Sequence, residues 1–323
     1  MPAFDTSESH CQIIDAADVA AKFVKRIQSE VLRRGADNNP VLRGILANDD
    51  FAAKKYADWT AKTCEKTGIK FELVEVDSMS AEEAVDAANN DPSVDGIMVY
   101  YPVFGDAQDE YLRNAVSIRK DVEALCHTYR YNMYHNIRSI QLPGGGASKS
   151  LLPCTPGAIV KILEYVGVYN HNLAEGNRMY GKTIAVVNRS EVVGRPLAAL
   201  CANDGAKVYS IDVDDILVFS RGNGIKLHKH EIATTDISKS AALGNADVVI
   251  SGVPVKGFKI DTADLKDGCI AINFATYQNF SPDIVEKASI FVKSVGKVTV
   301  AMLQRNVMRV SRSTDMCGSA DIL

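Results

Sequence analysis

The sequence lacks the features that mark membrane, secreted and nucleic-acid-binding proteins. None of its apolar runs approaches the roughly 18 residues needed to cross a membrane, and its start, "MPAFDTSESHCQII", has no secretory signal pattern. The formal net charge is only -4, whereas a nucleic-acid-binding domain is usually strongly basic. We therefore expect neither a membrane nor a nucleic-acid partner.

Paired cysteines are also lacking. The seven cysteines are scattered singly and none forms a C-x-x-C pair, which argues against a disulfide framework or a structural zinc site and is typical of a reduced, cytoplasmic protein. Cys154, in "PCTP", lies nearest a predicted active-site turn, and inert packing is its expected role. His228 and His230 have no Asp, Glu or Cys ligands at a suitable spacing, so we expect no metal site.

Strand and helix patterns alternate along the first 150 residues. Short apolar runs separated by helical segments indicate βαβ units and a parallel sheet. The helix over 51–67 should end at Gly68, and Ser80 with Glu83 predicts a capping box for the helix that runs to Asn90. Strands are expected at Val41–Asn48, Phe71–Val76 and Asp95–Val103.

A second α/β pattern follows the flexible connection "LPGGGASKS". Thr155 as N-cap and Pro156 as first helical residue predict a helix that ends at Gly167. The polar segment Val218–Ser240 has no clear period and is interpreted as a surface insertion. Strands are expected in "KTIAVVN", "AKVYSID", "ADVVISGV", "CIAINFA" and "SIFVKSV".

These patterns predict an α/β protein with two domains. The first spans residues 1–150, and the second, a Rossmann-like domain with a parallel sheet, spans 151–297. The last helix, within 298–323, is expected to pack back on the first domain. Two domains are reasonable for 323 residues, because a single hydrophobic core of that size is unusual.

The turn "NRSEVVG" lies between a predicted strand and a predicted helix but lacks the G-x-G-x-x-G pattern of dinucleotide sites. Its Gly194 nevertheless provides a small residue where phosphates approach helix amides, and Arg189, Ser190 and Val193 surround that position. Asp212 ends the next strand, where a carboxylate can accept hydrogen bonds from the adenosine ribose hydroxyls and repel a 2′-phosphate. The turn therefore predicts NAD rather than NADP as cofactor.

Two later turns are expected beside the same cofactor. They follow predicted strands at the carboxyl edge of the sheet, where ligands bind in open α/β folds. Their candidate residues are Gly252, Val253 and Pro254 in "SGVP", and Asn273, Phe274 and Ala275 in "NFA".

Five motifs, in order along the chain, resemble the methylenetetrahydrofolate dehydrogenase/cyclohydrolase family, with its monofunctional, NAD-dependent fungal members as the nearest. The motifs are "DGIMVYYPV", "KDVEAL", "LLPCTP", "RSEVVGRP" and "GKVTVAML". The resemblance implies two α/β domains with a cleft between them, folate against residues 1–150 and NAD against the second domain. It also implies a homodimer and a role in one-carbon metabolism and purine biosynthesis.

The chain departs from that family at the reacting centre. The family carries a Tyr-x-x-x-Lys pair on the helix after the first strand, and the matching residues here are Tyr56 and Thr60. Tyr100 stands where bifunctional relatives have a glutamine. Lys62 cannot replace the missing lysine, because two residues along a helix rotate the side chain by about 200°.

These departures predict a dehydrogenase with little or no cyclohydrolase activity. The carbon that loses hydride lies between two nitrogens, so oxidation needs positioning more than a base. Hydrolysis of the methenyl product instead requires water addition and proton transfer, which a lysine assists. The resemblance places the folate against five residues: Tyr56, Tyr100, Pro102, Glu123 and Thr299.

Three alternatives remain open. A bifunctional dehydrogenase/cyclohydrolase would need another group in place of the lysine, and a non-catalytic NAD or folate sensor is compatible with Thr60 and Tyr100. A hydroxy-acid or shikimate-type dehydrogenase is disfavoured, since removing an alcohol proton requires a base such as a Tyr–Lys pair.

Overall fold

The computed structural model describes residues 11–141, 147–221 and 229–314. It forms two compact units, each with its own sheet. The three-stranded unit comprises Ala20–Met133, Ile137–Cys154 and Thr299–Leu323, and the eight-stranded unit comprises Met1–Val19, Tyr134–Asn136 and Thr155–Val298. The predicted two-domain α/β class is confirmed.

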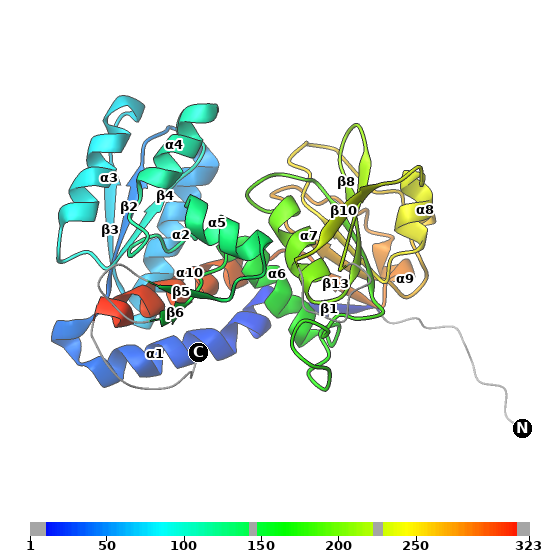
Figure 1. Cartoon of the computed structure of the whole chain (residues 1–323), viewed down its shortest axis with the longest axis horizontal. Helices are drawn as coiled ribbons and strands as arrows, with labels where there is room; N and C mark the ends of the chain where they lie inside the picture. The colour runs from blue at the N-terminus through cyan, green and yellow to red at the C-terminus, as the bar shows by residue number, and fades with distance from the viewer. Residues whose placement is uncertain (1–10, 142–146, 222–228, 315–323) are drawn as a thin grey trace, which may run out of the picture. The chain divides into compact units, whose positions relative to one another are not determined.

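The three-stranded unit is built from parallel βαβ connections. Its sheet has the order β3-β2-β4, with β2 at Val41–Leu46, β3 at Lys70–Glu75 and β4 at Gly96–Val99. Figure 1 shows helices α3 (Ala81–Asn90) and α4 (Ala107–Ala115) in front of this sheet, with α2 (Phe51–Thr67) behind it. Ile45, Val85 and Leu112 are among the buried side chains that fill the front layer.

Further elements complete this part of the chain. The antiparallel pair β5 (Ser139–Gln141) and β6 (Ala147–Lys149) follows the short helix α5 (His127–Tyr134). The long amphipathic helices α1 (Ala16–Arg34) and α10 (Gly296–Thr314) each place most of their length in the same unit.

The eight-stranded unit has the strand order β1-β13-β12-β11-β7-β8-β9-β10, and β9 runs antiparallel to both of its neighbours. The other neighbouring strands pair in parallel, so their carboxyl ends share one edge. The strands are β1 (Gln12–Ile14), β7 (Thr183–Val187), β8 (Lys207–Ile211), β9 (Ile216–Ser220), β10 (Glu231–Thr234), β11 (Val248–Ser251), β12 (Ile270–Asn273) and β13 (Ile290–Val292). The helices are α6 (Cys154–Tyr165), α7 (Gly194–Asn203), α8 (Lys239–Gly244) and α9 (Ile284–Lys287).

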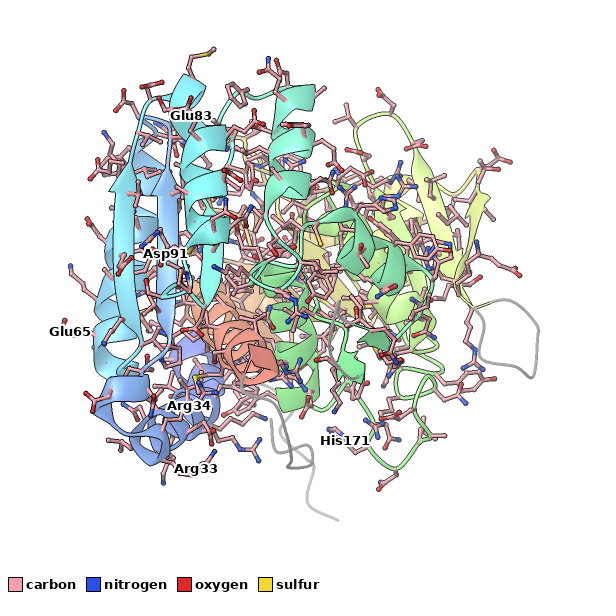
Figure 2. All side chains as sticks on the ribbon, turned by 60° about the vertical axis from the view of Figure 1, so that its left-hand side comes forward. Arg33, Arg34, Glu65, Glu83, Asp91 and His171 are labelled. Carbon is pink, nitrogen blue, oxygen red and sulfur yellow. The ribbon has the colours of Figure 1, made fainter. Side chains whose placement is uncertain are left out.

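Local sequence signals predict the end of α2 correctly but not the cap of α3. Gly68 ends α2 with a left-handed φ of 82°, as predicted, and its amide donates to Cys64 O. The capping box at Ser80 is wrong: the Ser80 hydroxyl donates to the Asp77 carboxylate at 3.0 Å and does not cap α3. Figure 2 shows Glu83 in the first turn of α3 and Asp91 just beyond its last turn.

Three features of the eight-stranded unit differ from expectation. Part of the predicted surface insertion Val218–Ser240 is a β-hairpin, and its strand β10 is exposed along its whole length, so it carries no apolar alternation. Helix α6 begins at Cys154, one residue before the predicted cap Thr155. Strand β1, which sequence patterns do not predict, pairs with β13. Most of the predicted flexible connection, residues 142–146, lies outside the described residues.

Candidate active site

Tyr56, Thr60 and Tyr100 form a tyrosine cluster in the three-stranded unit. Tyr56 and Thr60 lie one turn apart on α2, and the Thr60 hydroxyl donates to Tyr56 O at 2.9 Å. Tyr100 follows β4, and its ring meets that of Tyr56 edge-on, with centroids 5.9 Å apart. Burial raises the pKa of both phenols, so both remain neutral. Thr60 is fully buried, whereas Lys62 is exposed, as its predicted rotation requires.

Two side chains that sequence analysis missed hold the loop after Tyr100. The Asn48 amide donates to Tyr100 O at 2.8 Å and to Pro102 O at 2.7 Å. The Asp109 carboxylate accepts the amides of three successive residues, Val103, Phe104 and Gly105, at 2.9–3.1 Å. Predicted substrate residue Pro102, joined to Tyr101 by a cis peptide bond, is thereby fixed beside the cluster.

Glu123 lies within reach of the same cluster. Its Oε2 accepts the Val99 amide at 3.1 Å, next to Tyr100 in the chain. Burial raises the pKa of the Glu123 carboxyl to about 8, the Val99 amide opposes this, and the nearby Asp121 carboxylate adds to the rise. The negative charge of Glu123 also contributes to the raised pKa of Tyr56 and of Tyr100. The structure therefore brings these predicted substrate residues together.

Cys154 lies near the tyrosine cluster and Glu123. The Cys154 thiol donates to Val122 O at 3.4 Å, and burial raises its pKa well above the usual value, so it stays an unreactive thiol, in agreement with its predicted packing role. Thr299 lies in the first turn of α10 and is 7% exposed. Asn306, further along α10, donates to Val122 O and Leu152 O at 2.8 and 3.2 Å.

Three turns that sequence analysis predicts beside the cofactor are called the cofactor turns, and the first, residues 188–194, connects β7 to α7. Asn188 adopts a positive φ of 111°, and its side chain accepts the Ser190 amide at 2.6 Å. The Ser190 hydroxyl oxygen accepts the amides of Val193 and Gly194 at 3.3 and 3.4 Å. A Cβ at Gly194 would lie 1.8 Å from Asn188 O. Only glycine allows this approach to the strand end, and the contact of Gly194 with a cofactor phosphate stays a prediction.

The second and third cofactor turns, residues 251–254 and 273–275, are adjacent because β11 and β12 pair in parallel. The Asn188 amide donates to Gly252 O at 2.7 Å, which connects the first turn to the second. A Cβ at Gly252 would lie 1.9 Å from the Phe274 ring. Pro254 is exposed, and Phe274 and Ala275 are partly exposed. The structure therefore groups the candidate residues of all three turns.

Asn279, which sequence analysis missed, connects the second and third turns. Its side-chain oxygen accepts the Ser251 hydroxyl at 2.9 Å and the Val253 amide at 2.7 Å, while its side-chain nitrogen donates to Val253 O at 3.0 Å. Its own amide donates to Asn273 Oδ1 at 2.9 Å. Asn279 is completely buried, and no strand or helix pattern marks it in the sequence.

Arg189 and Asp212 are both predicted to bind the cofactor, and their side chains differ in how much of their hydrogen bonding the protein itself uses. Asp212 is exposed at the end of β8, and its carboxylate accepts the Val213 amide at 3.0 Å. The Arg189 guanidinium is instead directed at Ser210 and at the Asp215 carboxylate, 2.5 Å away.

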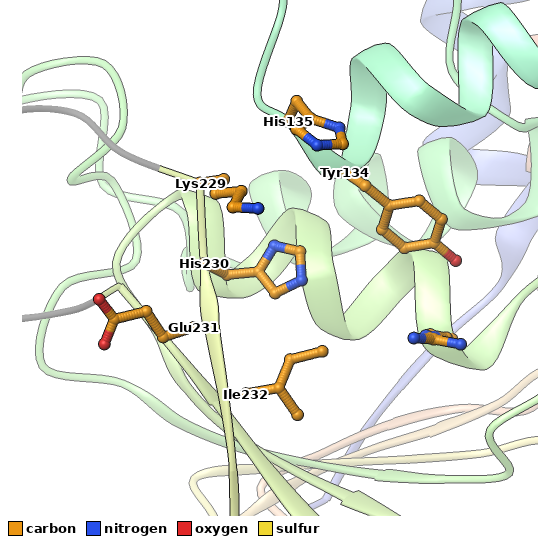
Figure 3. Close-up of a pocket in the computed structure, with 7 residues that line it drawn as sticks. Tyr134, His135, Lys229, His230, Glu231 and Ile232 are labelled. Atoms are coloured by element: carbon orange, nitrogen blue, oxygen red, sulfur yellow. The ribbon is translucent and has the colours of Figure 1, made fainter.

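A cavity of about 550 Å³ lies on another part of the eight-stranded unit, between Tyr134, Arg195 and the start of β10 (Figure 3). Its His230 is buried, stacks on Phe219 and donates its backbone amide to Asn203. Burial and the neighbouring cations lower the pKa of His230 to about 4. Among the described residues, no group of His, Cys, Asp and Glu side chains could hold a metal ion, and no helix could span a membrane. His228 lies outside those residues.

Comparison with known proteins identifies the family of this chain. Residues 14–123 match the family model described as "Tetrahydrofolate dehydrogenase/cyclohydrolase, catalytic domain". Residues 153–315 match the model described as "Tetrahydrofolate dehydrogenase/cyclohydrolase, NAD(P)-binding domain". The chain belongs to the tetrahydrofolate dehydrogenase/cyclohydrolase family.

Relatives within this family are similar over almost the whole chain. The methylenetetrahydrofolate dehydrogenases [NAD(+)] of Schizosaccharomyces pombe and Saccharomyces cerevisiae are each 51% identical, over 93% of this chain and 93% and 96% of theirs. The solved structure of the NAD-dependent 5,10-methylenetetrahydrofolate dehydrogenase from Saccharomyces cerevisiae has a TM-score of 0.88 and 48% identity, over 95% of this chain and 98% of that one. The bifunctional protein FolD of Methanosarcina mazei is 28% identical.

The raised pKa of Glu123 predicts a pH-dependent stability. The pKa of Glu123 is about 8 in the folded protein and 4.5 for a free glutamate. The stability contribution of the protonated side chain is therefore fully present below pH 4.5 and is lost as pH rises through 8. Glu123→Gln should therefore gain stability relative to the parent between pH 5 and pH 8.5, by about 3 kcal/mol. Thermal unfolding of both proteins across this range measures it. Glu83→Gln, at an exposed glutamate, is the control, and an equal gain in both variants would contradict the prediction.

Asn279 predicts a coupled loss of stability and cofactor affinity. Asn279→Ala leaves the buried Ser251 hydroxyl and the Val253 amide without their acceptor, which should cost about 2 kcal/mol. Since the second and third cofactor turns lose their connection, NAD should also bind more weakly, as fluorescence titration would show. Gln278→Ala removes a neighbouring amide that donates only to Lys293 O in the described contacts. If it weakens NAD binding as much, the Asn279 bonds are not the cause.

Proposed function

We propose that this protein oxidises 5,10-methylenetetrahydrofolate to 5,10-methenyltetrahydrofolate with NAD. The 51% identity to NAD-dependent methylenetetrahydrofolate dehydrogenases supports the reaction. The observation that carries the monofunctional form of the proposal is the tyrosine cluster, where buried Thr60 and Tyr100 provide no ammonium group. The enzyme is thus an oxidoreductase acting on a CH–NH bond.

The folate would bind in the three-stranded unit. Glu123 can hydrogen-bond the paired N–H donors of the pterin edge as a carboxylate, and these donors would favour its ionised form against the burial that raises its pKa to about 8. Tyr56, Tyr100, Pro102 and Thr299 would form the surrounding surface, with the loop at Pro102 fixed by Asn48. These residues orient the substrate rather than remove a proton, because the two nitrogens beside the reacting carbon stabilise its positive charge.

The eight-stranded unit would bind the cofactor. Helix amides at the start of α7, an exposed carboxylate at Asp212 and the close turns at Gly194 and Gly252 are appropriate for a dinucleotide. When bound, NAD accepts the hydride. The residues we propose for its binding are Arg189, Ser190, Val193, Gly194, Asp212, Gly252, Val253, Pro254, Asn273, Phe274 and Ala275.

Cellular context is part of the same proposal. We propose a homodimer that works in the cytoplasm, within one-carbon metabolism that supplies purine biosynthesis. The family resemblance supports the dimer, and the six described cysteines, all free thiols, support a reducing compartment. The proposed folate-binding domain is the predicted 1–150 with the helix of 298–323, and the proposed NAD-binding domain is the predicted 151–297. Residues 11–19 and Tyr134–Asn136 of the former lie in the eight-stranded unit.

A spectrophotometric assay tests the reaction and its cofactor. Purified protein with methylenetetrahydrofolate should reduce NAD and form the methenyl product, with kcat/KM for NADP at least about tenfold lower. The methenyl product should then decay at its uncatalysed rate. Absence of reduction, with NAD still bound, would favour a non-catalytic sensor, and accelerated decay would favour a bifunctional enzyme.

Restoring an ammonium group should restore hydrolysis. Thr60→Lys with Tyr100→Gln should speed the decay of the methenyl product by about 100-fold, the usual size of assisted proton transfer. Thr60→Lys alone should fold poorly, because Thr60 is completely buried beside Tyr100. The matched control is Ala61→Lys, which adds the same group one position along α2. Equal hydrolysis in both proteins would mean that position 60 has no special role.

A further inference from the structure

The Arg189 guanidinium is held by two segments of the eight-stranded unit. Its Nε donates to the Ser210 hydroxyl at 3.0 Å, and one terminal nitrogen donates to Ser210 O at 2.6 Å and Asp215 O at 3.2 Å. The other terminal nitrogen donates to the Asp215 carboxylate at 2.5 Å. The Arg189 side chain is only 13% exposed. These bonds use four of its five N–H donors and pair its charge with a carboxylate.

Asp215 is placed for this contact by a short turn. The Asp212 amide donates to Asp215 O at 3.0 Å, which closes the connection between β8 and β9. Asp212 and Asp215 therefore occupy the two ends of one turn. Their carboxylates act differently: that of Asp212 bonds only to the Val213 amide in the described contacts, whereas that of Asp215 binds Arg189.

This difference bears on the choice between NAD and NADP. A 2′-phosphate is dianionic and is usually bound by an arginine, which donates two parallel hydrogen bonds to it. Arg189 is the cation of the first cofactor turn, and Asp215 already occupies it. NAD, which has a ribose hydroxyl at that position, needs an acceptor such as Asp212 and no cation.

We propose that Asp215 is a specificity-determining residue, which disfavours NADP by keeping Arg189 from pairing with a 2′-phosphate. This inference rests on the cofactor site of the proposed function. It differs from a general repulsion by the acidic segment, because it assigns the effect to one carboxylate and one guanidinium. Asp214 offers a direct comparison, since it is an exposed carboxylate in the same turn.

The test compares dissociation constants for NAD and NADP, measured by calorimetry without folate, in the full-length protein. Asp215→Ala should bind NADP about tenfold more tightly than the parent, the size of one charged hydrogen bond. Asp215→Asn, which keeps the size of the side chain and still lacks the charge, should show the same direction. Arg189→Ala with Asp215→Ala should bind NADP no better than Arg189→Ala alone.

The control is Asp214→Ala, which removes the same charge without touching Arg189. If it strengthens NADP binding as much as Asp215→Ala, or if the double variant keeps the gain, the inference is overturned. An unchanged NADP affinity in both Asp215 variants, with intact unfolding curves, overturns it as well. Binding is measured without turnover. A protein that binds NAD but never reduces it would therefore contradict the proposed function, while the NADP affinities of the variants would still test the role of Asp215.

Discussion

The Asp109 carboxylate and several neutral amide side chains satisfy the backbone of the short loops at the tyrosine cluster and at the cofactor turns. Loops at strand ends leave carbonyl and amide groups unpaired, and burying such groups without partners is costly. Asn48 resolves this for the loop after Tyr100, and Asn306 does so for Val122 and Leu152. Asn188 and Asn279 connect the three cofactor turns. An amide both donates and accepts, so it fixes a loop without adding a buried charge.

Asp109 and Asp121 are buried carboxyl groups near the tyrosine cluster. Burial raises the pKa of Glu123 to about 8, close to neutral pH, while the two phenols stay neutral. This suits a reaction in which the substrate carbon gains positive charge as it loses hydride. Thr60 is completely buried and uncharged, so under the proposed function the tyrosine cluster provides neither a cation that would repel the positive substrate carbon nor an ammonium group for hydrolysis.

The sequence predicts elements wherever a local signal exists. The helix of 51–67 combines apolar periodicity with a glycine stop and was found, and Gly194 was correctly placed at the turn between a strand and a helix. The strand β10 has no apolar alternation because it is exposed along its length. Asn279 and Asn48 were missed for a different reason. Their function comes from backbone groups distant in sequence, and an asparagine in a loop has no signature of its own.

Asp212, Asp214 and Asp215 show most directly what the fold adds to the sequence. As letters they form one acidic segment, and charge alone supports only a general negative field. The turn from β8 into β9 separates them: the antiparallel pairing of these strands returns the chain so that the Asp215 carboxylate reaches Arg189, whereas the Asp212 carboxylate accepts the Val213 amide. The turn between β8 and β9, which precedes the predicted insertion Val218–Ser240, therefore pairs the Asp215 carboxylate with Arg189 and leaves that of Asp212 bonded only to the Val213 amide in the described contacts.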